Sequence, residues 1–131
     1  MTGSGLRPAR EWMDLLRDVV VGHDVQMLSG RGGEPTLKVR DVFLHSQYRP
    51  REEAQKLVDS AQLDTSRPVI AIGMGLGYHL LELARRGMKV AAIEPDPAVA
   101  KLALDSVLVD SDIPIAVGDL DALSHDAAFA R

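Results

Sequence analysis

The chain has 131 residues, which is enough for one compact domain and too few for two. It contains no cysteine, and 46% of its residues are hydrophobic, so a disulfide framework, thiolate chemistry and a disordered chain are all excluded. Residues 1–51 carry 8 basic and 6 acidic side chains, whereas residues 52–131 carry 7 and 13. Because the second part is acidic and the whole chain holds only 5 aromatic residues, nucleic acid is not expected as a partner.

Two further function classes are disfavoured by what the sequence lacks. No apolar run approaches the roughly 18 residues of a membrane helix, and no signal peptide opens the chain, so we expect a cytoplasmic protein without a membrane partner. The four histidines show no spacing typical of metal ligands, so no metal site is predicted.

The first part of the chain, residues 1–48, predicts a helix and a β-hairpin. Apolar side chains follow at helical spacing between Pro8 and Gly22, namely Trp12, Leu15, Leu16, Val19 and Val20. Two partly alternating segments, 25–29 and 36–39, then flank a turn-rich stretch with three glycines, which indicates a hairpin whose second strand continues through 42–44.

The second part, residues 49–131, alternates strands with helices. Helices are predicted from Pro50 through Ala61, after the glycine-rich turn as far as Gly87, and from Ala98 to about Val107. Apolar strands are predicted at 69–72, 89–93 and 113–117. Continuous apolar strands separated by helices favour one parallel sheet, with 89–93 in the middle. The fold class is therefore α/β, a partial Rossmann-like sheet preceded by a helix and a hairpin, and the two parts are expected to form one compact unit.

The first strand-to-helix turn of this sheet carries the most specific motif. Glycines stand at 73, 75 and 77, followed directly by Tyr78. Glycines permit a tight turn and a close approach of ligand to backbone, and the start of a helix offers free N–H groups. A dinucleotide fingerprint would need glycine at 78, where Tyr78 stands. The spacing instead resembles motif I of class I S-adenosylmethionine-dependent methyltransferases, although a glycine-rich turn that only links strand to helix has the same pattern.

Acidic residues follow the next two strands. Glu94 ends the strand 89–93, 21 residues after Gly73, where a carboxylate can accept hydrogen bonds from both ribose hydroxyls. Asp119 follows the third strand, and in the methyltransferase pattern an acid there reaches the adenine amino group. The run 91–97, with Pro95 after Glu94, resembles the second motif of that family. A solvated loop carboxylate or a helix cap is the alternative for each acid, and Asp96 before Pro97 fits a cap better.

Together these residues predict a small-molecule adenosyl ligand, S-adenosylmethionine or another adenine nucleotide. The predicted binding residues are Gly73, Met74, Gly75, Gly77, Tyr78, Glu94, Pro95 and Asp119. His79 is the only histidine expected near them. No catalytic residue can be nominated, because a complete methyltransferase sheet has about seven strands and its reacting groups usually follow the fourth.

Two segments also resemble a narrower family, the motility accessory factors. The segments are 44–54, LHSQYRPREEA, and 73–83, GMGLGYHLLEL. The resemblance implies the N-terminal domain of a protein of flagellin glycosylation, related to archaeal 6-hydroxymethylpterin diphosphokinases. Arg49 departs from it, since an acidic residue is expected there, and the later Gly-Pro-Ser-Leu segment of the transferase domain is absent. The alternative function is thus a non-catalytic structural or interaction module of a larger glycosyltransferase or pyrophosphokinase.

The strand 69–72 is expected to lie at an open edge of the sheet. We expect the hairpin of 25–44, a second copy of the chain, or a C-terminal domain of the same protein to cover this edge. Asp119 and Asp121 also form an Asp-x-Asp pattern that holds a metal and a nucleotide-sugar diphosphate in many glycosyltransferases, and acids at a helix start explain it about as well.

Overall fold

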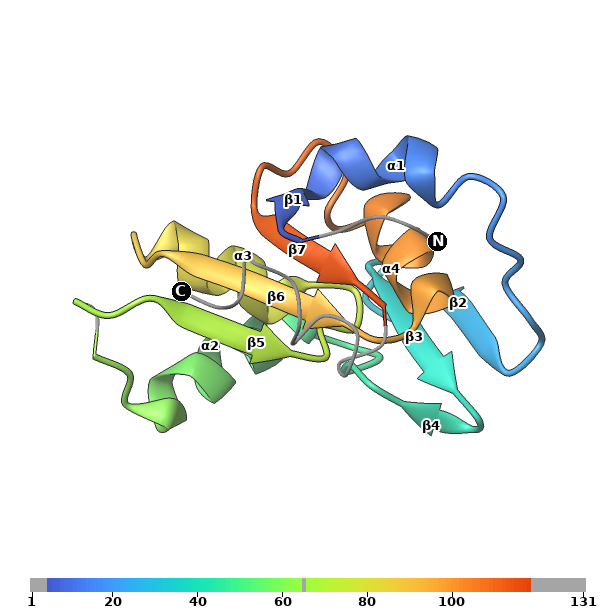
Figure 1. The fold of residues 1–131 in the computed structure, drawn as a ribbon. Coiled ribbons are helices and arrows are strands. Elements are labelled where there is room, and N and C mark those ends of the chain that lie inside the picture. The colour runs from blue at the N-terminus through green and yellow to red at the C-terminus, as the bar shows by residue number, and fades with distance from the viewer. Residues whose placement is uncertain (1–4, 65, 119–131) are drawn as a thin grey trace.

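The computed structural model describes residues 5–64 and 66–118, and it shows a mixed α/β fold with two sheets (Figure 1). The four-stranded sheet has the order β1-β7-β6-β5. Its strands are β1 (Arg7–Pro8), β5 (Val69–Ile72), β6 (Val90–Glu94) and β7 (Pro114–Val117). The second sheet is antiparallel, with β2 (Val25–Ser29), β3 (Pro35–Val39) and β4 (Val42–Phe43). The helices are α1 (Trp12–Leu15), directly after the 3-10 turn Ala9–Glu11, α2 (Pro50–Ala61), α3 (Tyr78–Arg85) and α4 (Pro97–Leu104).

The three predicted strands of the second part are confirmed as parallel neighbours. β5 pairs with β6 and β6 pairs with β7, both parallel, so β6 is the middle strand of the three as expected. β1 adds an antiparallel strand next to β7, because Arg7 pairs with Ile115. The α/β class and the partly parallel sheet are therefore confirmed, and the finer Rossmann-like classification stays a prediction.

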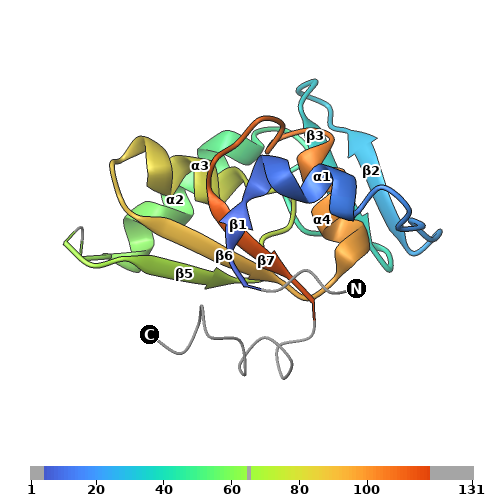
Figure 2. The ribbon, with the colours of Figure 1, turned by 45° about the horizontal axis from the view of Figure 1, so that its top comes forward.

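All four described helices lie on one side of this sheet (Figure 2). Side chains of β5 alternate accordingly: Val69 and Ala71 are half-buried on the helix side, whereas Ile70 is 57% and Ile72 66% exposed on the other side. Farther along that second face, Ile93 and Ala116 form a small buried cluster with Leu6. Among the described residues, the second face is thus covered at β7 and open at β5.

The predicted starts of α2 and α4 and the predicted end of α3 are confirmed by their caps. The predicted end of α4 near Val107 is wrong, because the helix ends at Leu104 and the Leu108 N–H donates back to the Ala103 carbonyl. Pro50 occupies the first turn of α2, followed by two glutamates that suit a helix N-terminus. The Asp96 carboxylate accepts a hydrogen bond from the Ala98 N–H at 2.9 Å, so Asp96 caps α4 as predicted. Gly87, with φ of 81°, follows α3 in the left-handed conformation that commonly terminates a helix.

The N-terminal helix is shorter than predicted, since α1 ends at Leu15 and Val20 is 86% exposed. Just beyond this end, the backbone of the chain contacts a side chain of α4. The Lys101 ammonium group of α4 donates hydrogen bonds to the carbonyl oxygens of Arg17 and Val19, both at 2.8 Å. Lys101 thus binds carbonyl groups at a point where the apolar pattern alone predicts more helix.

The hairpin differs from the prediction in two ways. Its second strand does not continue, because Arg40 and Asp41 adopt positive φ angles of 46° and 67° and form a turn between β3 and β4. The hairpin also does not cover the edge of β5, and no strand of the described ranges pairs there. It forms its own sheet because Val25 and Leu37 are buried in the main core, on the helix side.

One hydrophobic core joins the described residues of the first part to those of the second. Trp12 and Leu37 from the first part are fully buried in the same cluster as Leu80 and Ile115 from the second. The Trp12 indole N–H also donates to the Ile115 carbonyl at 2.9 Å. In the described part of the chain, no helix has the length and apolar character needed to cross a membrane.

Candidate functional site

The glycine-rich turn lies between β5 and α3, at the carboxyl end of the parallel strands. Gly73, Gly75 and Gly77 all have positive φ angles, of 80°, 54° and 98°. The Gly73 N–H donates to the Ile93 carbonyl at 2.7 Å, which holds the start of the turn against β6. Such φ values are costly for residues with a Cβ atom, so the backbone itself requires glycine here.

The surroundings of the three glycines differ. A Cβ atom on Gly75 would lie 2.6 Å from His45 Nε2, and one on Gly77 would lie 2.7 Å from the Leu108 side chain. A Cβ on Gly73 would meet nothing within 4 Å. Close packing with the protein therefore also requires glycine at 75 and 77, whereas Gly73 faces open space that a ligand could enter.

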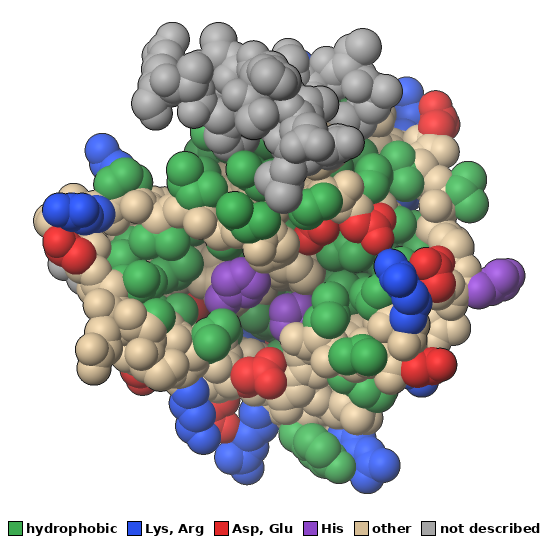
Figure 3. Space-filling model, turned by 60° about the horizontal axis from the view of Figure 1, so that its bottom comes forward, with side chains coloured by type: hydrophobic (Ala, Val, Ile, Leu, Met, Phe, Trp, Pro, Cys, Tyr) green, Lys and Arg blue, Asp and Glu red, His purple; other side chains and the backbone are tan. Residues whose placement is uncertain are grey.

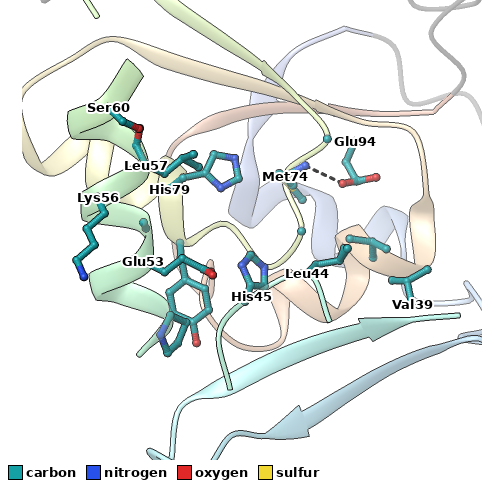
Figure 4. A pocket seen from close by; sticks show the side chains of 16 residues that line it. Val39, Leu44, His45, Glu53, Lys56, Leu57, Ser60, Met74, His79 and Glu94 are labelled. Carbon is teal, nitrogen blue, oxygen red and sulfur yellow. Dashed lines mark hydrogen bonds between the residues drawn. The ribbon is translucent and has the colours of Figure 1, made fainter. Parts of the chain in front are cut away.

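That open space is part of a cavity of about 850 Å³, within the size range of small-molecule sites. Its walls come from α2, from the turn with the start of α3, and from Val39 of β3 with the segment that follows β4 (Figure 4). Glu94 of β6 and Val99 of α4 complete them. Figure 3 shows the cavity as a hollow containing two histidine side chains, and His45 and His79 are the histidines among its lining residues. The main lining residues are Val39, Leu44, His45, Glu53, Lys56, Leu57, Ser60, Gly73, Met74, Gly75, Tyr78, His79 and Glu94. Most of this wall is apolar, with a few polar groups grouped around the turn.

Glu94 is the acid that the structure brings to the turn. The residue is 6% exposed, and its carboxylate accepts hydrogen bonds from the N–H groups of Met74 at 2.9 Å and Asp96 at 3.0 Å (Figure 4). Burial raises the pKa of Glu94, and hydrogen bonds from Met74, Asp96 and Gly75 N–H groups oppose that effect. Each carboxylate oxygen has a second lone pair, so Glu94 can hold the turn and still accept a ligand hydroxyl.

His45 is the residue that sequence reasoning missed. It is 9% exposed, and its Nε2 atom accepts a hydrogen bond from the Leu76 N–H at 2.9 Å. Burial, with a smaller contribution from nearby His79, lowers the pKa of His45 to about 4, so the ring is neutral at pH 7. Only its place in the segment 44–54, one of the two segments on which the predicted resemblance to motility accessory factors depends, could have drawn attention to it.

His79 lies in the first turn of α3 and lines the same cavity. Burial lowers its pKa, and a hydrogen bond with the Gly73 backbone opposes this shift. The expectation that His79 alone would lie near the turn is wrong, because His45 also lines the cavity and accepts a hydrogen bond from the turn (Figure 4).

The predicted binding residues fall into three groups. Those that line the cavity are Gly73, Met74, Gly75, Tyr78 and Glu94. Gly77 packs on Leu108, and Pro95 is exposed outside the cavity wall. Asp119 lies outside the described residues. The α2 wall, with Lys56, Leu57 and Ser60, was not predicted, because its position depends on how α2 packs against α3.

Comparison with known proteins gives partial similarities, and no family model matches the chain. An uncharacterized protein of Treponema pallidum is 35% identical over 88 residues, which is 63% of this chain and 30% of that protein. An uncharacterized protein of Methanocaldococcus jannaschii is 30% identical over 91 residues, 65% of this chain and 32% of that protein. The chain thus spans about a third of the length of these relatives.

A named activity appears among the relatives as well. A probable ribosomal RNA small subunit methyltransferase A of Methanosarcina mazei is 38% identical over 64 residues, which is 49% of this chain and 24% of that protein. The protein of the same name in Methanothermobacter thermautotrophicus is 35% identical over 65 residues. The similarity therefore supports a methyltransferase-like region in this chain and nothing more specific.

Proposed function

We propose that the cavity binds S-adenosylmethionine or another adenine nucleotide, in a Rossmann-like domain of the methyltransferase type. One observation carries the proposal: Glu94 at the end of β6 and the open side of Gly73 at the end of β5 meet in one cavity. Ligands of open α/β sheets bind at this edge, outside the carboxyl ends of the parallel strands. The partial similarity to two methyltransferases supports the same ligand class.

The charges around the cavity favour S-adenosylmethionine over a nucleoside triphosphate. Among the described residues, Glu53 and Glu94 line the cavity, and Lys56 is the single cationic side chain beside them. His45 and His79 add no charge near pH 7, because the pKa of each is lowered. A triphosphate needs an excess of positive charge or a metal, whereas a sulfonium ligand with an amino group suits acidic surroundings. Glu94 would accept hydrogen bonds from the ribose hydroxyls, and Asp119 is proposed for the adenine edge.

Calorimetric titration with S-adenosylmethionine, S-adenosylhomocysteine, ATP and a nucleotide sugar tests this proposal. We expect both adenosyl ligands to bind more tightly than ATP, and no heat of binding from the nucleotide sugar. Tighter binding of ATP would contradict the charge argument. If none of the four ligands gives a heat of binding at millimolar concentration, the proposal itself is contradicted.

Two glycines provide a matched pair of variants for this titration. Gly73 and Gly87 have φ angles of 80° and 81°, and a Cβ atom on either meets nothing within 4 Å. Alanine at each position therefore imposes similar backbone strain, roughly 1–2 kcal/mol, but only Gly73 lines the cavity. Gly73→Ala is expected to weaken ligand binding, whereas Gly87→Ala should leave the affinity unchanged.

The second candidate is a non-catalytic module of a larger motility accessory factor-like glycosyltransferase or pyrophosphokinase. The open face of β5, where Ile70 and Ile72 are exposed, supports this alternative, because such a face suits a contact with another domain or a second copy. Under this alternative none of the four ligands binds. Calorimetric titration then gives the same result for Gly73→Ala and Gly87→Ala.

A further inference from the structure

We propose that His45 is a positioning residue, which holds the glycine-rich turn in its ligand-binding conformation from the N-terminal sheet. The inference rests on the proposed function, because the turn matters only if a ligand binds beside it. His45 lies 31 residues before Leu76 in the chain. It stands in the segment that follows β4 of the N-terminal sheet, whereas the turn that it contacts follows β5 of the other sheet.

The imidazole ring touches the turn at two successive residues. Its Nε2 atom accepts the Leu76 N–H at 2.9 Å in buried surroundings. The same ring fills the space beside Gly75, where a Cβ atom would come within 2.6 Å of Nε2. A buried N–H group without a partner is costly, so Nε2 stabilises this turn conformation over others that leave the Leu76 N–H unpaired.

The N-terminal sheet in turn fixes the position of His45. The Thr36 hydroxyl, itself buried, donates to the His45 carbonyl at 2.9 Å, and the Leu44 N–H donates to the Leu37 carbonyl at 2.8 Å. β3 also reaches the far end of the turn, because the Tyr78 hydroxyl donates to the Pro35 carbonyl. The His45 and Tyr78 rings meet edge to face, with centroids 5.1 Å apart. The turn is therefore attached to β3 through both of these side chains.

Only the neutral tautomer with the proton on Nδ1 can accept the Leu76 N–H, because protonated imidazole is a donor at both nitrogens. Protonation of His45 would therefore place the Nε2–H group against the Leu76 N–H, and the turn would be released because two donors cannot bond to each other. The other titratable groups lining the cavity are Tyr78 and His79 from α3, Glu53 and Lys56 from α2, and Glu94 from β6. Of these, His79 acts on His45 by charge, and it lowers the pKa of His45 in the same direction as burial does.

The decisive variants separate hydrogen bonding from packing. His45→Gln keeps an acceptor oxygen for the Leu76 N–H, whereas His45→Leu fills similar space without one. The control is His23→Leu, since His23 is exposed and lies away from the cavity. The measurements are the dissociation constant for S-adenosylhomocysteine and the hydrogen-exchange rate of the Leu76 amide without ligand.

For His45→Leu we expect the exchange rate of the Leu76 amide and the dissociation constant for S-adenosylhomocysteine each to rise about tenfold or more. His45→Gln should stay within about threefold of the unchanged chain, and His23→Leu should match it. The proposal is overturned if the Gln and Leu variants bind alike, or if exchange at Leu76 is the same in His45→Leu as in the unchanged chain.

Two further results keep the test decisive. If the unchanged chain binds no adenosyl ligand, the proposed function fails, while exchange at Leu76 still shows whether His45 holds the turn. If His45→Leu does not fold, the unchanged chain is followed from pH 7 to pH 3. Exchange at Leu76, corrected for its intrinsic pH dependence, must then rise as NMR shows His45 gaining a proton, and an unchanged corrected rate would overturn the proposal.

Discussion

Glu82 and Glu94 are both 6% exposed, yet they lie in opposite electrostatic surroundings. Glu82, in α3, forms ion pairs with Arg85 and Arg86, and hydrogen bonds from Arg85 first, then Arg86, lower its pKa to about 2. Glu94, at the end of β6, accepts hydrogen bonds from backbone N–H groups, and burial raises its pKa.

The difference separates a structural carboxylate from a candidate binding group. The partners of Glu82 follow three and four residues later on the same helix, so this arrangement is local and needs no ligand. Glu94 draws its partners from the turn and the α4 cap and lies beside a cavity, and none of the cationic side chains in the described ranges pairs with it. A buried acid with a raised pKa in a cleft is a frequent mark of a functional site.

The largest expected effect is on stability. Glu94→Ala leaves the buried N–H group of Met74 and the partly buried N–H group of Asp96 without their partner, at a cost of about 2–4 kcal/mol in the free energy of unfolding. Glu82→Ala should cost less than half as much, because Arg85 and Arg86 can turn to water. Urea denaturation of the two variants measures both values. Equal losses would show that the two carboxylates are equivalent in the fold.

The next effect is on ligand affinity. Glu94→Gln keeps one acceptor oxygen but loses the charge-assisted bonds, so the dissociation constant for S-adenosylmethionine should rise about tenfold or more. Glu82→Gln is the matched control, since it removes the same charge outside the cavity, and its affinity should equal that of the unchanged chain. A similar loss in both variants would mean that general charge, rather than the position of Glu94, governs binding.

A smaller effect isolates the helix cap from the binding group. Asp96→Ala removes the side-chain cap of α4, with an expected loss of about 1 kcal/mol in stability. The Asp96 backbone N–H still donates to Glu94, so the ligand affinity should stay within about twofold. Thermal unfolding and calorimetry of one sample give both numbers. A large loss of affinity would place the Asp96 side chain in the site.

The smallest effect is on the pH dependence of stability, where the two glutamates differ in sign. Glu82 contributes stability above its ordinary pKa of 4.5, and this is lost as the pH falls toward about 2. Because the pKa of Glu94 is raised in the folded chain, its contribution is greatest at low pH and is lost as the pH rises above 4.5. Denaturation at stepped pH should show Glu82→Gln flattening the acid side of the curve. Glu94→Gln should remove the opposite slope above pH 4.5, and slopes of the same sign would contradict the comparison.

Local signals in the sequence determined much of the second part of this protein. The strands β5, β6 and β7, the caps at Pro50, Asp96 and Gly87, and the glycine-rich turn follow from apolar runs and from residues with known backbone preferences. The placement of Glu94 beside the turn also follows, because parallel strands bring their carboxyl ends to one edge of a sheet.

Only the tertiary structure decided the rest, since each remaining feature depends on residues far apart in the chain. His45 contacts Leu76 across 31 positions, and Lys101 reaches Arg17 across 84. The His45 contact shows why Gly75 must lack a side chain, since the ring fills the space of a Cβ atom. The Lys101 contact lies just beyond α1, which ends before its apolar pattern does. Periodicity records which face of an element is apolar, but not which distant residue packs against it, so the hairpin's separate sheet and the α2 wall of the cavity were decided by packing.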